Sequence, residues 1–93
     1  MRMHTTSRHA RTSPALRRLL EQRLGRVERF APASEAHVVL DTQKNRHVVE
    51  IRLHVRGREL VVREESHDAV TSIEAACARL EVQLKRMKER RKG

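Results

Sequence analysis

A regular apolar spacing near the C-terminus does most to restrict how this chain can fold. Apolar residues recur there at intervals of three, four, three, four and three positions, namely Val70, Ile73, Cys77, Leu80, Leu84 and Met87. This spacing places them along one face of an α-helix, which we expect to begin around Asp68 and to end at about Arg90. An apolar face of this length must be covered, so the preceding residues have to supply a partner layer.

Three segments before this helix alternate between apolar and polar residues, which is the pattern of half-buried β-strands. They cover residues 35–43, 46–57 and 58–65. The first seven residues alternate in the same way and predict a further short strand. Between that strand and residue 35, the stretch 12–30 predicts a helix with Ser13 as its N-cap and Pro14 at its first position.

One face of this first helix is apolar, and its residues are Leu16, Leu19, Leu20, Leu24, Val27 and Phe30. We expect the helix to end near Pro32, which breaks the pattern. The elements together predict one α+β domain over residues 1–93, in the order β-α-β-β-β-α. Two helices would pack on one face of a four-stranded sheet, and the basic end, residues 89–93, is expected to fray.

The turn between the last two strands sets how their residues pair. We expect a two-residue turn at Gly57 and Arg58, because glycine at the first central position suits a type II′ turn. That register brings the apolar residues of both strands to one face. On the other face it places like charges opposite each other, Arg52 opposite Arg63 among them, and such pairs destabilise a sheet.

The composition favours binding over catalysis. The 93 residues include no Trp, no Tyr and a single Phe, so the core must be aliphatic and thin. A deep catalytic pocket is an improbable use of such a domain. The net charge of +9, from 21 Lys and Arg against 12 Asp and Glu, indicates an anionic partner, of which nucleic acid is the commonest.

Several other functions are disfavoured by the sequence. No apolar run exceeds four residues, so we expect neither a membrane span nor a signal peptide. A single cysteine, Cys77, agrees with a cytoplasmic location, and its apolar surroundings predict a core residue rather than a nucleophile. The histidines show no zinc-ligand spacing, and a glycine-rich phosphate loop is missing. We therefore expect no enzymatic activity, metal, cofactor or small-molecule substrate.

The outer face of the predicted sheet carries charges of both signs. Its basic residues Arg2, His4, Arg52, His54, Arg56 and Arg63 lie among Glu50, Glu59 and Glu65. Such a face could contact a partner, but mixed charge on an open sheet face is also ordinary solubility chemistry, which is the interpretation we favour.

A stripe of basic residues lies beside the apolar face of the C-terminal helix. Positions i, i+4, i+7 and i+11 share one side of a helix, and here they are Arg79, Gln83, Arg86 and Arg90. The helix acids Glu74 and Glu81 fall on the opposite flank. We expect them to pair there with Lys85 and Lys88. Because each arginine offers a planar fork of donors, the stripe predicts a phosphate-binding ridge, with a solvated helix face as the alternative.

Four stretches of the chain match a known pattern in order and spacing. They are "TSPALRRLLEQRLGRVERF", "HVVLDTQK", "LHVRGREL" and "SHDAVTSIEAACARLEVQLKRMK". Taken together, from Met1 to about Lys88, the chain resembles the ribosome hibernation promoting factors. That family includes the ribosome-associated inhibitor proteins and has also been labelled sigma-54 modulation proteins.

The resemblance implies a fold related to double-stranded-RNA-binding domains and a role in stressed or stationary bacteria. Such proteins lodge in the messenger and transfer RNA channel of the small ribosomal subunit and block translation. The resemblance assigns rRNA binding to Arg79, Lys85, Arg86, Lys88 and Arg90, beside Gln83. Val82 stands where relatives usually carry Arg, and Val70 where they often carry Tyr. As a short form, the protein would need a separate dimerisation factor to pair ribosomes.

Two rival functions stay open at this point. One is a free double-stranded-RNA-binding protein that recognises the shape of the A-form helix. The other is a protein-interaction adaptor that uses its sheet face on an acidic protein and binds no RNA.

Overall fold

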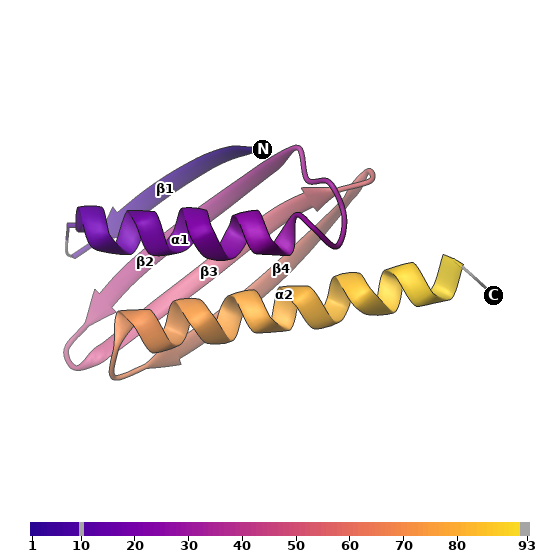
Figure 1. The fold of residues 1–93 in the computed structure, drawn as a ribbon. Coiled ribbons are helices and arrows are strands. Elements are labelled where there is room, and N and C mark those ends of the chain that lie inside the picture. Colours follow the sequence, from indigo (N-terminus) through magenta and orange to yellow (C-terminus); the bar gives the residue numbers. More distant parts are fainter. Residues whose placement is uncertain (10, 92–93) are drawn as a thin grey trace.

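The computed structural model describes residues 1–9 and 11–91, with side chains described as far as Glu89. Its elements in chain order are β1 (Arg2–Arg8), α1 (Pro14–Val27), β2 (Glu35–Gln43), β3 (Arg46–Val55), β4 (Arg58–Ser66) and α2 (Ala69–Arg91). The strands form one sheet in the order β1-β2-β3-β4, in which only β1 and β2 run parallel. Both helices cover the same face of this sheet (Figure 1). The predicted α+β fold is confirmed.

Helix α1 begins as predicted and ends earlier. The hydroxyl of Ser13 accepts a hydrogen bond from the N–H of Leu16 and caps the first turn. The helix ends at Val27, well before Pro32, and the N–H of Phe30 bonds to the Val27 carbonyl three residues back. This tighter turn leads the chain towards β2 while the Phe30 side chain still packs against the core.

The turn between β3 and β4 lies one residue earlier than predicted. Its central residues are Arg56 and Gly57, with φ angles of 52° and 75°. Two positive φ angles in succession are the geometry of a type I′ turn, not of the type II′ turn expected from Gly57 and Arg58. Val55 therefore lies opposite Arg58.

The new register keeps the faces and removes the charge conflict. Leu53 lies opposite Leu60, a shift of two residues that leaves both apolar sets on the helix-covered side. Arg63 now lies opposite Glu50, whereas the predicted register placed it opposite Arg52. A pair of opposite charges stabilises the sheet and a pair of like charges does not, which is the physical reason for the difference.

The core is aliphatic and lies between the sheet and the two helices. Its largest fully buried side chains are Leu20, Leu24, Ile51, Leu53, Ile73, Leu80 and Leu84. The predicted apolar face of α2 is thus confirmed from Ile73 to Leu84, and Met87 is half-buried at its end. None of the helices in the described part of the chain is long and apolar enough to cross a membrane.

The first turn of α2 faces the sheet through a serine. Val70, which was predicted to face the sheet, is 38% exposed, and Ser72 is buried in its place. The hydroxyl of Ser72 donates to the carbonyl of His47 at 2.8 Å and lies 2.7 Å from the hydroxyl of Ser66. These bonds satisfy the buried hydroxyl of Ser72 and hold its side chain towards the sheet. Val70 is therefore turned towards solvent, and the prediction that it faces the sheet was wrong.

The start of α2 near Asp68 is confirmed by its capping bonds. The carboxylate of Asp68 accepts from the hydroxyl of Thr71 at 2.8 Å and from the N–H of Val70 at 3.2 Å. These two bonds, the Thr71 hydroxyl first, lower the pKa of the Asp68 carboxyl. At the other end α2 extends to Arg91. The end predicted to fray was residues 89–93, of which residues 92–93 lie outside the described residues.

Leu80→Ala should lower the free energy of unfolding by about 2–5 kcal/mol, because it opens a cavity beneath α2. Val82→Ala is the matched control: Val82 lies on the same helix, is 49% exposed and should cost less than about 1 kcal/mol. Urea unfolding followed by circular dichroism measures both variants. Equal losses in the two would contradict the orientation of α2.

Cys77 should react with a thiol reagent such as DTNB only when the protein unfolds. The side chain is buried, and burial, followed by the nearby charge of Glu81, raises the pKa of its thiol to about 12. The reactive thiolate is therefore scarce at neutral pH, and the sulfur is covered. The free energy of opening deduced from the labelling rate of the native state should match the one deduced from hydrogen exchange. Prompt labelling of the folded protein would show that the side chain of Cys77 does not face the core.

Candidate nucleic-acid interface

The predicted RNA-binding residues lie on the C-terminal half of α2. They are Arg79, Gln83, Lys85, Arg86, Lys88 and Arg90. The side chain of Arg90 lies outside the described residues. The last turns of α2 extend beyond the end of α1 and the β3–β4 turn (Figure 1). Leu84 is the last fully buried residue in the described part of this helix, so the final turns present several sides to solvent.

One flank of α2 carries the predicted stripe. Arg79, Gln83 and Arg86 line one shallow depression together with Ala78 and Val82. The helical spacing had predicted this grouping, and the structure confirms it for these three residues. Val82 therefore occupies the position from which an arginine would point into the same depression.

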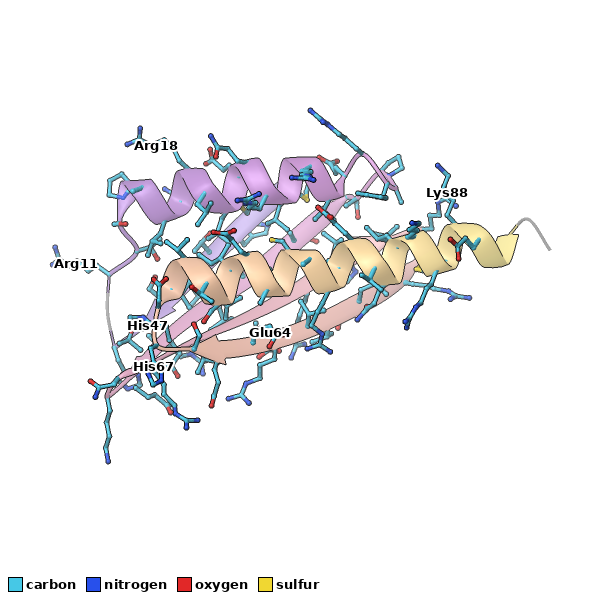
Figure 2. All side chains as sticks on the ribbon, turned by 60° about the horizontal axis from the view of Figure 1, so that its bottom comes forward. Arg11, Arg18, His47, Glu64, His67 and Lys88 are labelled. Carbon is cyan, nitrogen blue, oxygen red and sulfur yellow. The ribbon has the colours of Figure 1, made fainter. Side chains whose placement is uncertain are left out.

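Arg79 is held by the neighbouring strand. Its Nη1 donates to the carbonyl of Arg63 at 3.1 Å and lies 3.6 Å from Oε1 of Glu64. Glu64 lies on β4 below α2 (Figure 2). No acid of the helix enters the stripe, but the strand supplies one. Because Arg79 is 52% exposed, this pair is worth at most about 1 kcal/mol, and it lowers the charge that Arg79 offers.

The other flank of α2 carries the two lysines. Lys85 and Lys88 line a second depression with Phe30 and Glu89. Lys88 lies on the side of α2 opposite Glu64 (Figure 2). The predicted residues therefore lie on two flanks of one helix end, with the stripe on one flank and the two lysines on the other.

Two of the acids of α2, Glu74 and Glu81, pair with arginines of α1. Glu74 Oε2 lies 3.2 Å from Nη2 of Arg23, and Glu81 Oε1 lies 3.5 Å from Nε of Arg26. The predicted pairing of these acids with lysines of α2 was wrong, because α1 packs beside α2 and places its arginines next to the carboxylates. The pairs connect the two helices and take both acids away from the end of α2.

Three cations at the end of α2 are left without an acidic partner. Among the side chains that the structure describes, no carboxylate forms an ion pair with Lys85, Arg86 or Lys88. All three are exposed. We call these three residues the α2 basic end. A compact group of unneutralised cations on a projecting helix suits a polyanion.

A further group of arginines lies on α1 and just after it, and these residues were not among the predicted site residues. Arg23, Arg26 and Arg29 line a third depression with Glu21, Gln22 and Gly25. Their spacing of three residues in the sequence was the signal that could have indicated a common face.

A separate polar cluster lies on the outer face of the sheet. Ligand atoms of His4, Glu35 and His37 all lie within 4.8 Å of one another. A search for metal-ligand spacing along the chain missed this cluster, because His4 and His37 come from different strands. Within the described residues these are the side chains that could hold a metal ion.

Comparison with protein families gives one match to nearly the whole chain. The family model described as "Sigma 54 modulation protein / S30EA ribosomal protein" matches residues 3–92.

Curated relatives carry one name. A ribosome hibernation promoting factor from Pseudomonas putida is 29% identical over all of this chain and 92% of its own length. The factor of that name from Azotobacter vinelandii is 29% identical, over 97% of this chain and 85% of the relative. The one from Salmonella typhimurium is 28% identical, over 99% and 98%.

Solved structures with the same fold are also similar in sequence. A ribosomal subunit interface protein from Coxiella burnetii superposes with a TM-score of 0.88 at 27% identity, covering 96% of this chain and 99% of that one. The N-terminal domain of Protein Y from Thermus thermophilus gives a TM-score of 0.85 at 29% identity, covering 94% and 99%.

Proposed function

Because this chain belongs to the Sigma 54 modulation protein / S30EA ribosomal protein family, we propose that it is a cytoplasmic ribosome hibernation factor. It binds the small ribosomal subunit through phosphates of the rRNA, occupies the channel for messenger and transfer RNA, and inhibits translation under stress or in stationary phase. The family match confirms the resemblance noted in the sequence. A separate dimerisation factor is part of this proposal as a further partner in the pairing of ribosomes.

The α2 basic end is the observation that carries this proposal. Its side chains are exposed and, among the described residues, without an acidic partner, so they can approach a phosphate without first breaking an ion pair. Each contact with a phosphate would release condensed counterions, which makes the binding strong at low salt. Arg90, which continues the stripe in sequence, is proposed to extend the contact.

The two flanks favour a channel over an open duplex. Arg86 and Gln83 face one side of α2, whereas Lys85 and Lys88 face the other. A helix laid on one RNA duplex would use a single flank and leave the other in solvent. A helix inserted between RNA backbones would use both, and the ribosomal channel is such a passage. Phe30, at the base of the lysine flank, offers an apolar surface to a base or ribose.

Affinity for small subunits should fall steeply with salt. If Arg79, Lys85, Arg86, Lys88 and Arg90 each contact one phosphate, log K should decrease against log salt with a slope of roughly −3.5 to −4.5. Co-sedimentation with purified subunits between low and physiological salt measures this slope. A slope near zero would contradict binding through phosphates.

Arg86→Glu combined with Lys88→Glu should abolish subunit binding and translation inhibition, because two attractive contacts become repulsive. Both side chains are exposed, so the free energy of unfolding should change by less than about 1 kcal/mol. Co-sedimentation, in vitro translation and thermal melts measure the three quantities.

Arg11→Glu combined with Arg18→Glu is the matched control for that variant. It changes the net charge equally, at Arg18 of α1 and at Arg11 in the segment before this helix, and both side chains point away from α2 (Figure 2). This control should retain most of the inhibition. Equal loss in both variants would show that net charge, not the α2 basic end, drives binding. Equal affinity of the native chain for isolated duplex RNA and for subunits would favour the free RNA-binding function.

A further inference from the structure

The strand pairing brings three ligand-type side chains together on the uncovered face of the sheet. His4 of β1 lies directly opposite His37 of β2, and Glu35 precedes His37 by two positions on the same strand. Residues two apart on a strand point to the same face, so all three side chains lie on one side. The helices cover the other side, the one seen in front in Figure 1.

Both imidazole side chains approach the same carboxylate oxygen. Oε1 of Glu35 lies 2.9 Å from Nε2 of His4 and 3.1 Å from Nε2 of His37. The two imidazole rings stack with centroids 4.8 Å apart and an angle of 14° between their planes. Two imidazole nitrogens and one carboxylate oxygen are therefore already gathered before any ligand binds.

We propose that His4, Glu35 and His37 bind a divalent transition-metal ion of the zinc class. Zinc binds imidazole nitrogen and carboxylate oxygen at about 2.0–2.2 Å, so neighbouring ligand atoms in a tetrahedral shell lie about 3.3–3.5 Å apart. The two separations from Glu35 are a few tenths of an ångström shorter than that, and all the ligand atoms lie within 4.8 Å of one another, so rotation of the exposed side chains is required to bring the three around one ion. Calcium and magnesium prefer oxygen ligands and fit this set less well.

The surroundings allow an ion to enter. The side chains of His4, Glu35 and His37 are 51%, 36% and 45% exposed, so water can complete the coordination shell from the solvent side. Arg52, which lies opposite His37, is turned towards other acids: its Nε lies 3.2 Å from Glu50 and its Nη1 lies 3.8 Å from Glu59. The nearest fixed cation of β3 is thus neutralised by carboxylates outside the cluster.

Calorimetric titration of the untagged full chain with zinc chloride tests the site. The native protein should bind one ion per chain. His37→Gln and Glu35→Gln should each weaken binding by at least about tenfold, since each removes one of three ligands. NMR should show the imidazole nitrogens of His4 and His37 shifting on zinc addition. Because the site is distant from the α2 basic end, the result is independent of ribosome binding.

His67→Gln is the matched control, since His67 lies beyond β4 near the start of α2 and outside the cluster (Figure 2). It should bind zinc as the native chain does. Thermal melts show whether each variant is folded, and Glu35→Gln serves if His37→Gln unfolds. Absence of saturable binding to the native chain would overturn the proposal. A loss in His67→Gln equal to that in His37→Gln would overturn it as well.

Discussion

The packing of α2 against the sheet is the contact on which the rest of the molecule depends. Ile73, Leu80 and Leu84 are fully buried, and they cover β3 and β4 with a layer that contains no aromatic side chain. Because this apolar face is fixed against the sheet, the flanks of the helix must face outwards. The hydrophobic core thus determines where the cations of α2 are displayed, although the cations contribute little to the fold.

The ion pairs between α1 and α2 neutralise the charges along one part of α2 and leave those at its end unpaired among the described residues. Glu74 and Glu81 are held by Arg23 and Arg26, along the part of α2 that lies beside α1. Beyond that part, α2 has cations on both flanks and no described acidic partner for them. A charge of +9 spread evenly would give only weak attraction to any polyanion. Three of the 21 Lys and Arg residues, Lys85, Arg86 and Lys88, lie together at one projecting helix end, which is why the proposed RNA contact is placed there.

Features set by neighbouring residues in the chain could be predicted from the sequence. The cap at Ser13, the alternation of the strands and the apolar face of α2 each depend on local spacing. Features set by contacts between distant residues could not. The turn at Gly57 was placed one residue late, because the sequence does not show that Arg56 adopts a positive φ. The contact of Arg79 with Glu64 joins a helix to a strand and leaves no signal in the spacing.

The cluster of His4, Glu35 and His37 is another feature that could not be predicted from the sequence, because it depends on contacts between distant residues. A parallel pairing of β1 with β2 places His4 beside His37 across more than thirty residues of sequence, a proximity that only the sheet order creates. The sheet has one covered face and one open face, so the cluster and the basic flanks of α2 lie on opposite sides of a single layer. No described contact joins them. A chain held by RNA through α2 would keep its histidine face directed away from that contact, and an ion could bind there without competing with phosphates for the same side chains.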